Sequence, residues 1–325
     1  MGIHGMRYAR HLQDDVPGAI LSAVCRQDAV AGSRWARDRG ILFFADYREL
    51  IAEQGVDGIV VVTSPGTTAR VVLGALAAGK PVLVEKPLAT SLEEARAVDA
   101  AAHRKGAVCV MAHTLRWNAT IRALKDRIGE LGRLQMLAFS QRLGSLERRW
   151  LDRPELGGVL FNTGVHAFDL LRHLSGQEVR EVFCQCRRTA SRRTPDAFVA
   201  SMVLSGTALA TVDNCRTTPA RSGRVEVVGE RGELAGDHIH GTLARIVGSR
   251  RELLPVPGAV PTVREVLRDF VKAAAGRQAV PVGSGEGLRA LEIAVACQTS
   301  WRERRPVRMS ELSGESGAVP HSPPA

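Results

Sequence analysis

The chain has 325 residues, of which 45% are hydrophobic and 24% charged, a composition typical of a globular protein with more than one domain. It contains no run of about 18 apolar residues and no basic stretch followed by an apolar core at its front, so we expect neither a membrane span nor a secretory signal. The formal net charge is +10, but the arginines are spread along the chain and aromatic residues make up only 4%, which argues against a nucleic-acid partner.

Residues 19–113 alternate between strand and helix patterns. Strands are predicted at 19–25, 41–47, 57–64, 81–87 and 108–113, and helices at 29–39, 67–79 and 88–106. The run DGIVVVTS is almost continuously apolar, as expected for a strand that is covered on both faces. This alternation predicts an α/β Rossmann domain with a doubly wound parallel sheet.

The pattern changes after about residue 115. Helices are predicted at 118–130, 157–175, 263–275 and 286–303, and strand-like runs at 135–143, 178–189, 197–206, 208–218, 223–230 and 241–248. Short turns with Gly or Pro join these runs, which predicts a mostly antiparallel open sheet with helices on one face. We therefore expect a dinucleotide-binding domain at 1–115, a substrate-binding and oligomerisation α/β domain at 116–312 and a disordered tail at 313–325.

The six cysteines show no metal-ligand spacing. Cys184 and Cys186 are two residues apart in a strand-like run, so a buried thiol pair on one face of a strand is expected. This usage of cysteine, without a secretory signal, fits a reducing cytoplasmic location.

The front of the chain, MGIHGM, is typical of the second half of a dinucleotide-binding loop. Gly2 and Gly5 have the spacing of the last two glycines of G-x-G-x-x-G, where one lets the backbone approach the pyrophosphate and the other lets the helix pack closely. The strand that precedes this loop is central in such a sheet and would lie before Met1. Because its absence would leave two strand edges without partners, we expect the true start to lie upstream, the alternative being an impaired product.

Arg26 directly follows the predicted strand at 19–25, near the place where an acidic residue would hold the ribose hydroxyls of NAD. A guanidinium suits the 2′-phosphate of NADP, so NADP is expected to be preferred over NAD. In the alternative, Arg26 is a solvated loop residue and Asp28 binds the ribose. Ser64 and Pro65 are further expected cofactor contacts.

Three segments carry a resemblance to a known family: GKPVLVEKPLATSLEEA, GGVLFNTGVHAFDLLRHLSG and GLRALEIAVACQTSWRERRPVRM. They are similar to motifs of the Gfo/Idh/MocA family (glucose–fructose oxidoreductase, inositol dehydrogenase, rhizopine catabolism), and the resemblance covers nearly the entire chain. It implies a Rossmann domain followed by an open-faced α/β domain whose sheet often mediates oligomerisation, so a homo-oligomer is expected. It also implies hydride transfer between a nicotinamide cofactor and a sugar, cyclitol or similar compound.

The resemblance further implies site residues. Lys86 of the Glu85-Lys86-Pro87 motif is expected near nicotinamide and substrate, Glu85 is expected to contact the cofactor, and His166 is expected to be the acid/base. The chemistry of the residues agrees, because histidine can accept a hydroxyl proton near neutral pH and a lysine cation stabilises negative charge that develops on oxygen.

Asn162, His166, Asp169 and His173 fall on one face of the helix at 157–175. We expect Asn162 to assist His166 in catalysis and Asp169 to bind substrate. The alternatives are a polar packing face and a metal site at His166, Asp169 and His173, although the family carries no metal there and none is expected. Arg116 and Trp117, which follow the last Rossmann strand, are expected to bind substrate or to serve in domain packing.

Two residues depart from the family pattern, in addition to the absent first strand. Asn162 stands where the family has Asp, and Thr68 stands near a position where many members have His. The leading hypothesis is an NADP-preferring oxidoreductase of a sugar-like hydroxyl compound. These departures leave a second hypothesis open, a non-catalytic sensor that binds dinucleotide on the same fold.

Overall fold

The computed structural model describes residues 2–104, 106–144, 153, 158–191 and 193–313, and the chain divides into two compact units. Unit 1 consists of residues 1–122 and 256–291, and unit 2 of residues 123–255 and 292–325. The chain therefore returns to unit 1 through residues 256–291, whereas the sequence predicted a single crossing after residue 115. Of the predicted tail at 313–325, Ser313 ends a short helix and the rest lies outside the described residues.

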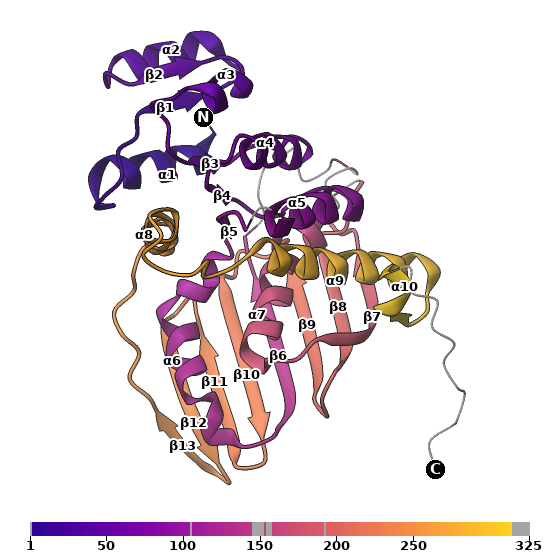
Figure 1. The fold of residues 1–325 in the computed structure, drawn as a ribbon. Helices are drawn as coiled ribbons and strands as arrows, with labels where there is room; N and C mark the ends of the chain where they lie inside the picture. The colour runs from indigo at the N-terminus through magenta and orange to yellow at the C-terminus, as the bar shows by residue number, and fades with distance from the viewer. Residues whose placement is uncertain (1, 105, 145–152, 154–157, 192, 314–325) are drawn as a thin grey trace. The chain divides into compact units, whose positions relative to one another are not determined.

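Unit 1 has the predicted alternation of strands and helices. Its parallel strands are β1 (Ala23–Cys25), β2 (Leu42–Phe44), β3 (Ile59–Val61), β4 (Val82–Val84) and β5 (Cys109–Met111), and its helices are α1 (Ile3–Asp14), α2 (Ala29–Arg37), α3 (Tyr47–Ala52), α4 (Pro65–Ala77), α5 (Leu92–Arg104) and α8 (Thr262–Ala274) (Figure 1). The three residues of β4 and of β5 are all buried, which agrees with strands covered on both faces. The Rossmann-like α/β fold is thus confirmed.

The strands of unit 1 form two separate parallel sheets. β1 pairs only with β2, and the second sheet has the order β3-β4-β5, so β1 and β3 each end a sheet. No described strand lies between them.

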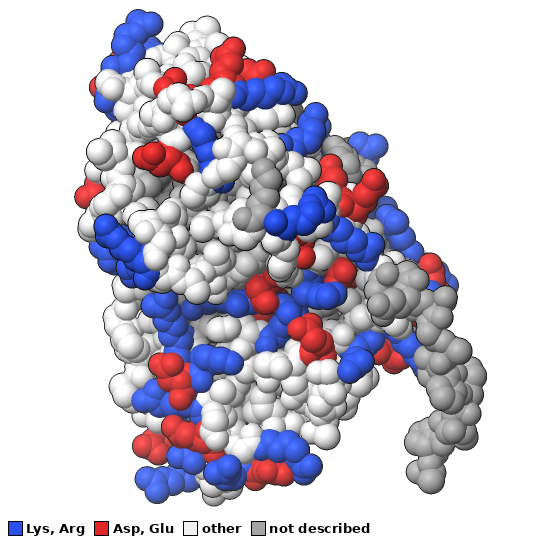
Figure 2. Space-filling view, viewed as in Figure 1, with Lys and Arg blue, Asp and Glu red and all other residues white. Residues whose placement is uncertain are grey.

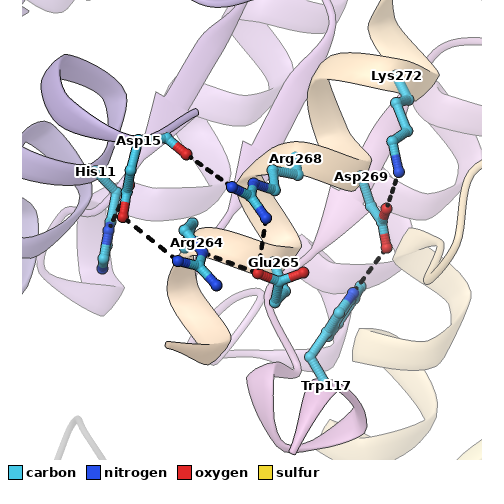
Figure 3. A network of polar contacts seen from close by, with 8 residues as sticks. All are labelled: His11, Asp15, Trp117, Arg264, Glu265, Arg268, Asp269 and Lys272. Atoms are coloured by element: carbon cyan, nitrogen blue, oxygen red, sulfur yellow. Dashed lines mark hydrogen bonds and ion pairs between the residues drawn. The ribbon is translucent and has the colours of Figure 1, made fainter. Parts of the chain in front are cut away.

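Helix α8 packs in unit 1, although the sequence analysis placed this segment in the second domain. Figure 3 shows Arg264 and Arg268 of α8 facing Asp15, just beyond α1, with Glu265 between the two arginines. Arg268 donates to the backbone carbonyl of Asp15 at 3.3 Å, and Arg264 lies 3.8 Å from the Asp15 carboxylate. These contacts hold α8 against the end of α1.

Unit 2 is built on one mixed sheet of nine strands with the order β13-β12-β11-β10-β6-β9-β8-β7-β14. The strands are β6 (Leu134–Arg142), β7 (Val179–Arg187), β8 (Ala197–Leu204), β9 (Leu209–Cys215), β10 (Ser222–Gly229), β11 (Gly232–Asp237), β12 (Thr242–Val247), β13 (Arg250–Leu253) and β14 (Val307–Arg308). All neighbours are antiparallel except β6 and β9, so the predicted, mostly antiparallel sheet is confirmed.

Helix α7 (Val165–Ser175) packs on the sheet of unit 2 and continues directly from a π-helical turn, Leu160–Gly164 (Figure 1). Further helical segments of unit 2 are most of α6 (Ala119–Arg127), which begins in unit 1, the 3-10 helix Ile128–Leu131, the last part of α9 (Ser284–Glu303), and α10 (Ser310–Ser313). Cys184 and Cys186 are both buried on one face of β7, with their sulfurs 3.8 Å apart, which confirms the predicted thiol pair.

Charges of both signs are interspersed on the face of the molecule in Figure 2, where basic side chains alternate with acidic ones. The excess of arginine therefore forms no continuous basic surface among the described residues of this face.

Candidate functional site

The first turn of α1 fits an anionic ligand. Gly2 is extended and precedes the helix, and no atom lies within 4 Å of a Cβ built on it, so a ligand can approach its backbone. The first turn carries no acidic side chain, and Gly5 is buried. Because the N–H groups and the dipole of a helix N-terminus favour phosphate, these residues fit the pyrophosphate of a dinucleotide.

The carboxylate of Glu85 links α1 to the end of β4. It accepts a hydrogen bond of 2.7 Å from the Tyr8 hydroxyl, lies 3.0 Å from Nε2 of His4, and accepts one of 3.0 Å from the backbone N–H of Lys86. Glu85 itself is only 8% exposed. The amino end of α1 is therefore held at the carboxyl end of β4, where ligands of doubly wound folds lie.

The charges of this cluster shift two pKa values in opposite directions. Burial alone would raise the pKa of Glu85, but the hydrogen bond from His4 and the charge of Lys86 outweigh it and leave that pKa below its usual range. Burial, followed by the neighbouring Glu85 charge, raises the pKa of Tyr8 well above its usual value. Tyr8 therefore stays a hydrogen-bond donor to an ionised carboxylate near neutral pH.

Lys86 lies directly after β4 and is half-buried. The motif that carries it is thus found where the sequence predicted, beside Glu85. Sequence reasoning missed His4 and Tyr8. Their signal was present, because the two residues are four apart on one face of the helix that follows Gly2.

Arg26 and Asp28 follow β1 and contact each other. The guanidinium of Arg26 donates to Asp28 at 3.3 Å, and both side chains are partly exposed. Asp28 also caps α2, since its carboxylate accepts the backbone N–H of Ala31 at 3.0 Å. Arg26 and Asp28, the two residues that the sequence offered as contacts for the ribose end of the cofactor, therefore both follow the same strand.

Ser64 and Pro65 begin α4 directly after β3. Ser64 is the N-cap and is exposed, and Pro65 is the first helical residue. Thr68 is buried, lies 3.0 Å from the Thr63 hydroxyl and donates to the Ser64 carbonyl at 3.3 Å. Its hydroxyl supports the local turn.

Arg116 and Trp117, expected to bind substrate or pack domains, make contacts inside unit 1. Arg116 forms an ion pair of 2.5 Å with Glu286, and the indole N–H of Trp117 donates to Asp269 of α8 at 2.8 Å, as Figure 3 shows for Trp117. Both partners belong to the returning segment 256–291. These contacts favour the packing alternative for both residues.

Asn162, His166 and Asp169 lie in unit 2 on the π-turn and α7, at the spacing that the sequence predicted. Asn162 and His166 are half-buried, and Asp169 is 1% exposed. The amide oxygen of Asn162 accepts a hydrogen bond of 2.7 Å from Arg216, a residue just after β9 that the sequence analysis did not select. Nothing in the sequence pattern around Arg216 indicates this pairing across 54 residues.

The expected residues thus form two groups, one in each unit. Unit 1 holds Gly2, Gly5, Arg26, Ser64, Pro65, Glu85, Lys86, Arg116 and Trp117, and unit 2 holds Asn162, His166 and Asp169. Within the described ranges, no three His, Cys, Asp or Glu side chains are grouped as metal ligands. Across the same residues, no helix has the length and apolar character needed to cross a bilayer.

Comparison with known proteins agrees with this arrangement. Residues 1–113 match the family described as "Oxidoreductase family, NAD-binding Rossmann fold", and residues 120–235 match the "GFO/IDH/MocA C-terminal domain". The chain belongs to the Gfo/Idh/MocA oxidoreductase family. The resemblance that the E-K-P motif and the α7 segment carried is therefore confirmed.

Two curated relatives align over nearly their full length. The scyllo-inositol 2-dehydrogenase (NAD(+)) of Bacillus subtilis (strain 168) is 26% identical over 98% of this chain and 96% of its own. The inositol 2-dehydrogenase 1 of Saccharopolyspora erythraea is 29% identical over 95% of this chain and 94% of its own. A solved structure from Desulfitobacterium hafniense, titled a putative NADPH-dependent oxidoreductase, superposes with a TM-score of 0.87 at 20% identity over 96% of both chains, which shows the shared Gfo/Idh/MocA fold.

Replacing Glu85 tests the cluster that it forms with His4, Tyr8 and Lys86. Because its pKa is lowered in the folded state, ionised Glu85 stabilises the fold above the usual glutamate range, and this contribution is lost as the pH falls through the folded value. We expect Glu85→Gln to lose about 1.5–3 kcal/mol at neutral pH and to flatten the fall in stability on acidification. Thermal unfolding midpoints from neutral pH to about pH 3 measure both effects.

Tyr8→Phe is the matched control, since it removes one hydrogen bond to Glu85 and keeps the charge. It should cost about 1 kcal/mol. It should weaken the pH dependence only in part, because the hydrogen bond from His4 and the charge of Lys86 still lower the pKa of Glu85. A Glu85→Gln variant with the same acid profile as the parent chain would contradict the assignment of that profile to Glu85.

Proposed function

We propose that this protein is a cytoplasmic nicotinamide-dinucleotide-dependent oxidoreductase that transfers a hydride between nicotinamide and a sugar, cyclitol or similar hydroxyl or carbonyl compound. The observation that carries the proposal is that two relatives aligned over nearly their whole length are named inositol dehydrogenases. The chain also retains a lysine after β4 and a histidine on α7, the two residue types that such chemistry needs.

A bound dinucleotide supplies the hydride or takes it up. In the proposal, the first turn of α1 binds its pyrophosphate, and Ser64 and Pro65 contact it at the start of α4. The Lys86 ammonium stabilises negative charge on the substrate oxygen, which lowers the barrier most where the site excludes water. His166 accepts the hydroxyl proton in oxidation and returns it in reduction.

Asn162 and Asp169 complete the proposed substrate contacts. Asn162 is neutral, so it orients substrate by hydrogen bonds without adding negative charge beside His166. Its carbonyl oxygen accepts a hydrogen bond from Arg216, which fixes the orientation of the amide. Asp169 is an acceptor suited to a substrate hydroxyl.

We further propose NADP as the preferred cofactor. The support is Arg26 at the end of β1, because a guanidinium can bind the two charges of a 2′-phosphate. The carboxylate of Asp28 lies 3.3 Å from the same guanidinium. The preference for NADP therefore depends on whether the 2′-phosphate binds Arg26 more strongly than Asp28 does.

The acid/base role is tested by His166→Ala. We expect kcat for oxidation of a panel of cyclitols and sugars to fall by at least about 10²-fold, with the dissociation constant of the dinucleotide unchanged. His173→Ala, two turns along the same helix, is the control and should keep its activity. Unchanged turnover in His166→Ala would remove this residue from the chemistry, and dinucleotide binding without turnover of any compound by the parent chain would favour a sensor.

Cofactor choice is tested by paired variants at the end of β1. Arg26→Ala should weaken NADP⁺ binding about tenfold and leave NAD⁺ binding unchanged, the loss expected for one charge-assisted contact. Asp28→Ser keeps a side chain able to cap α2 but removes the competing carboxylate, so NADP⁺ should bind more tightly. Calorimetric titration with each cofactor measures the dissociation constants. Weaker NAD⁺ binding in Asp28→Ser would instead show that Asp28 binds the ribose.

A homo-oligomer through the sheet of unit 2 is also proposed. The face of β7, β8 and β9 opposite the buried side chains carries exposed Phe183, Val199, Val203 and Leu209. Val199→Glu should lower the mass measured by light scattering to that of the monomer and leave the circular dichroism unchanged. Val30→Glu, at an equally apolar exposed site on α2, is the control; an unchanged mass in Val199→Glu would exclude this face.

A further inference from the structure

Arg216 is a nearly buried cation that is held at the end of β9. It continues the alternation of this strand, whose residues Ala210, Val212 and Asn214 are buried on one face of the sheet. Its backbone N–H donates to the carbonyl of Asp196 at 3.0 Å, which extends the ladder between β8 and β9 by one residue. Arg216 is 9% exposed, so its main chain is fixed and most of its side chain is removed from water.

The guanidinium of Arg216 contacts the helical segment that carries the proposed acid/base. Its Nη1 donates to the amide oxygen of Asn162 at 2.7 Å. Asn162 lies in the π-helical turn, and β9 packs against both this turn and α7. His166 follows Asn162 by four residues and therefore lies on the same face. Both residues are half-buried, so this face retains surface that a ligand can reach.

The carboxylate of Asp196, the acidic residue whose main chain pairs with Arg216, stabilises a loop. It accepts the backbone N–H groups of Thr189, Ala190 and Ser191 at 2.9, 2.7 and 2.6 Å. The contact that Arg216 makes with the π-turn joins a permanent cation to a neutral amide, and this contact brings no negative charge to the face that carries His166.

We propose that Arg216 binds a carboxylate of the substrate, and that the substrate is therefore a sugar acid or a similar polyhydroxy acid. A guanidinium can bind a carboxylate through two parallel hydrogen bonds, and the low dielectric of a buried site strengthens them. One cation matches the single charge of a carboxylate better than the two charges of a phosphate. The inference rests on the proposed function, because that function supplies the oxidation of a hydroxyl group near His166.

The spacing along the helical segment places the two ends of such a substrate. His166 lies about one turn beyond Asn162, or roughly 5 Å along the axis, and Asp169 lies roughly 10 Å beyond it. A carboxylate at Arg216 is thus about one turn away from a hydroxyl at His166. That separation fits a hydroxyl several carbons from the carboxylate, as in a sugar acid, and not the adjacent hydroxyl of an α-hydroxy acid. Asp169 remains available for further hydroxyl groups at the far end.

Binding of matched compounds tests the proposal without turnover. Calorimetric titration compares D-gluconate with D-glucitol, and the methyl glycoside of D-glucuronate with that of D-glucose. The titrations are made in the presence and in the absence of NADPH, which cannot oxidise a hydroxyl and finds no reducible carbonyl in these compounds. We expect the acid of at least one pair to bind at least about tenfold more tightly than its neutral partner, the gain expected for a charge-assisted bidentate contact.

Variants of Arg216 show whether this residue is the source of the preference. Arg216→Gln should reduce the ratio of the two dissociation constants to about threefold or less and leave that of the neutral partner unchanged. Arg216→Lys should retain part of the ratio, because it keeps the charge without the planar fork. Arg224→Gln, at an exposed position on β10, removes the same charge and should leave the ratio unchanged. If Arg216→Gln does not fold, Asn162→Asp gives a second test, since it sets a competing carboxylate against the intact guanidinium and should lower the ratio.

Equal binding of acid and neutral partner in both pairs, or an acid preference that survives Arg216→Gln, would overturn the proposal. Tighter binding of D-glucitol phosphate than of D-gluconate would overturn the choice of a carboxylate, and lactate that binds as tightly as the sugar acids would overturn the placement of the hydroxyl. Oxidation of neutral compounds with the same kcat/KM as the acids would refute this inference and leave the proposed function standing. Selective binding of acids through Arg216 without turnover of any compound would do the reverse.

Discussion

The buried carboxylate of Glu85 is the contact on which the arrangement of unit 1 depends. The two parallel sheets share no ladder hydrogen bonds among the described strands, so side chains and helices must hold them in place. Glu85 ties the amino end of α1 to the end of β4, and Arg264 and Arg268 of α8 contact the residue beyond the carboxyl end of the same helix. Because α1 is held at both ends, the positions of Gly2 and Gly5 at its start are restrained.

Much of the architecture could be predicted from the periodicity of apolar residues, because strands buried on both faces and amphipathic helices space these residues differently. The run that contains β3 is an example. The short strands β11 and β13 and the helix α3 were missed, since they are short segments whose place is set by neighbouring strands and packing. The return of 256–291 to unit 1 depends on partners such as Asp269 for Trp117, which are more than 150 residues apart and leave no local signal.

In the candidate site, too, features carried by neighbouring residues could be predicted and contacts between distant residues could not. Lys86 and the Asn162–His166–Asp169 spacing are local features and were found, whereas Arg216 reaches Asn162 from another strand. This contact places a guanidinium against the neutral amide of Asn162. An arginine beside a neutral amide leaves positive charge near α7, while an aspartate would cancel it. The amide of Asn162 therefore adds no negative charge to this part of α7.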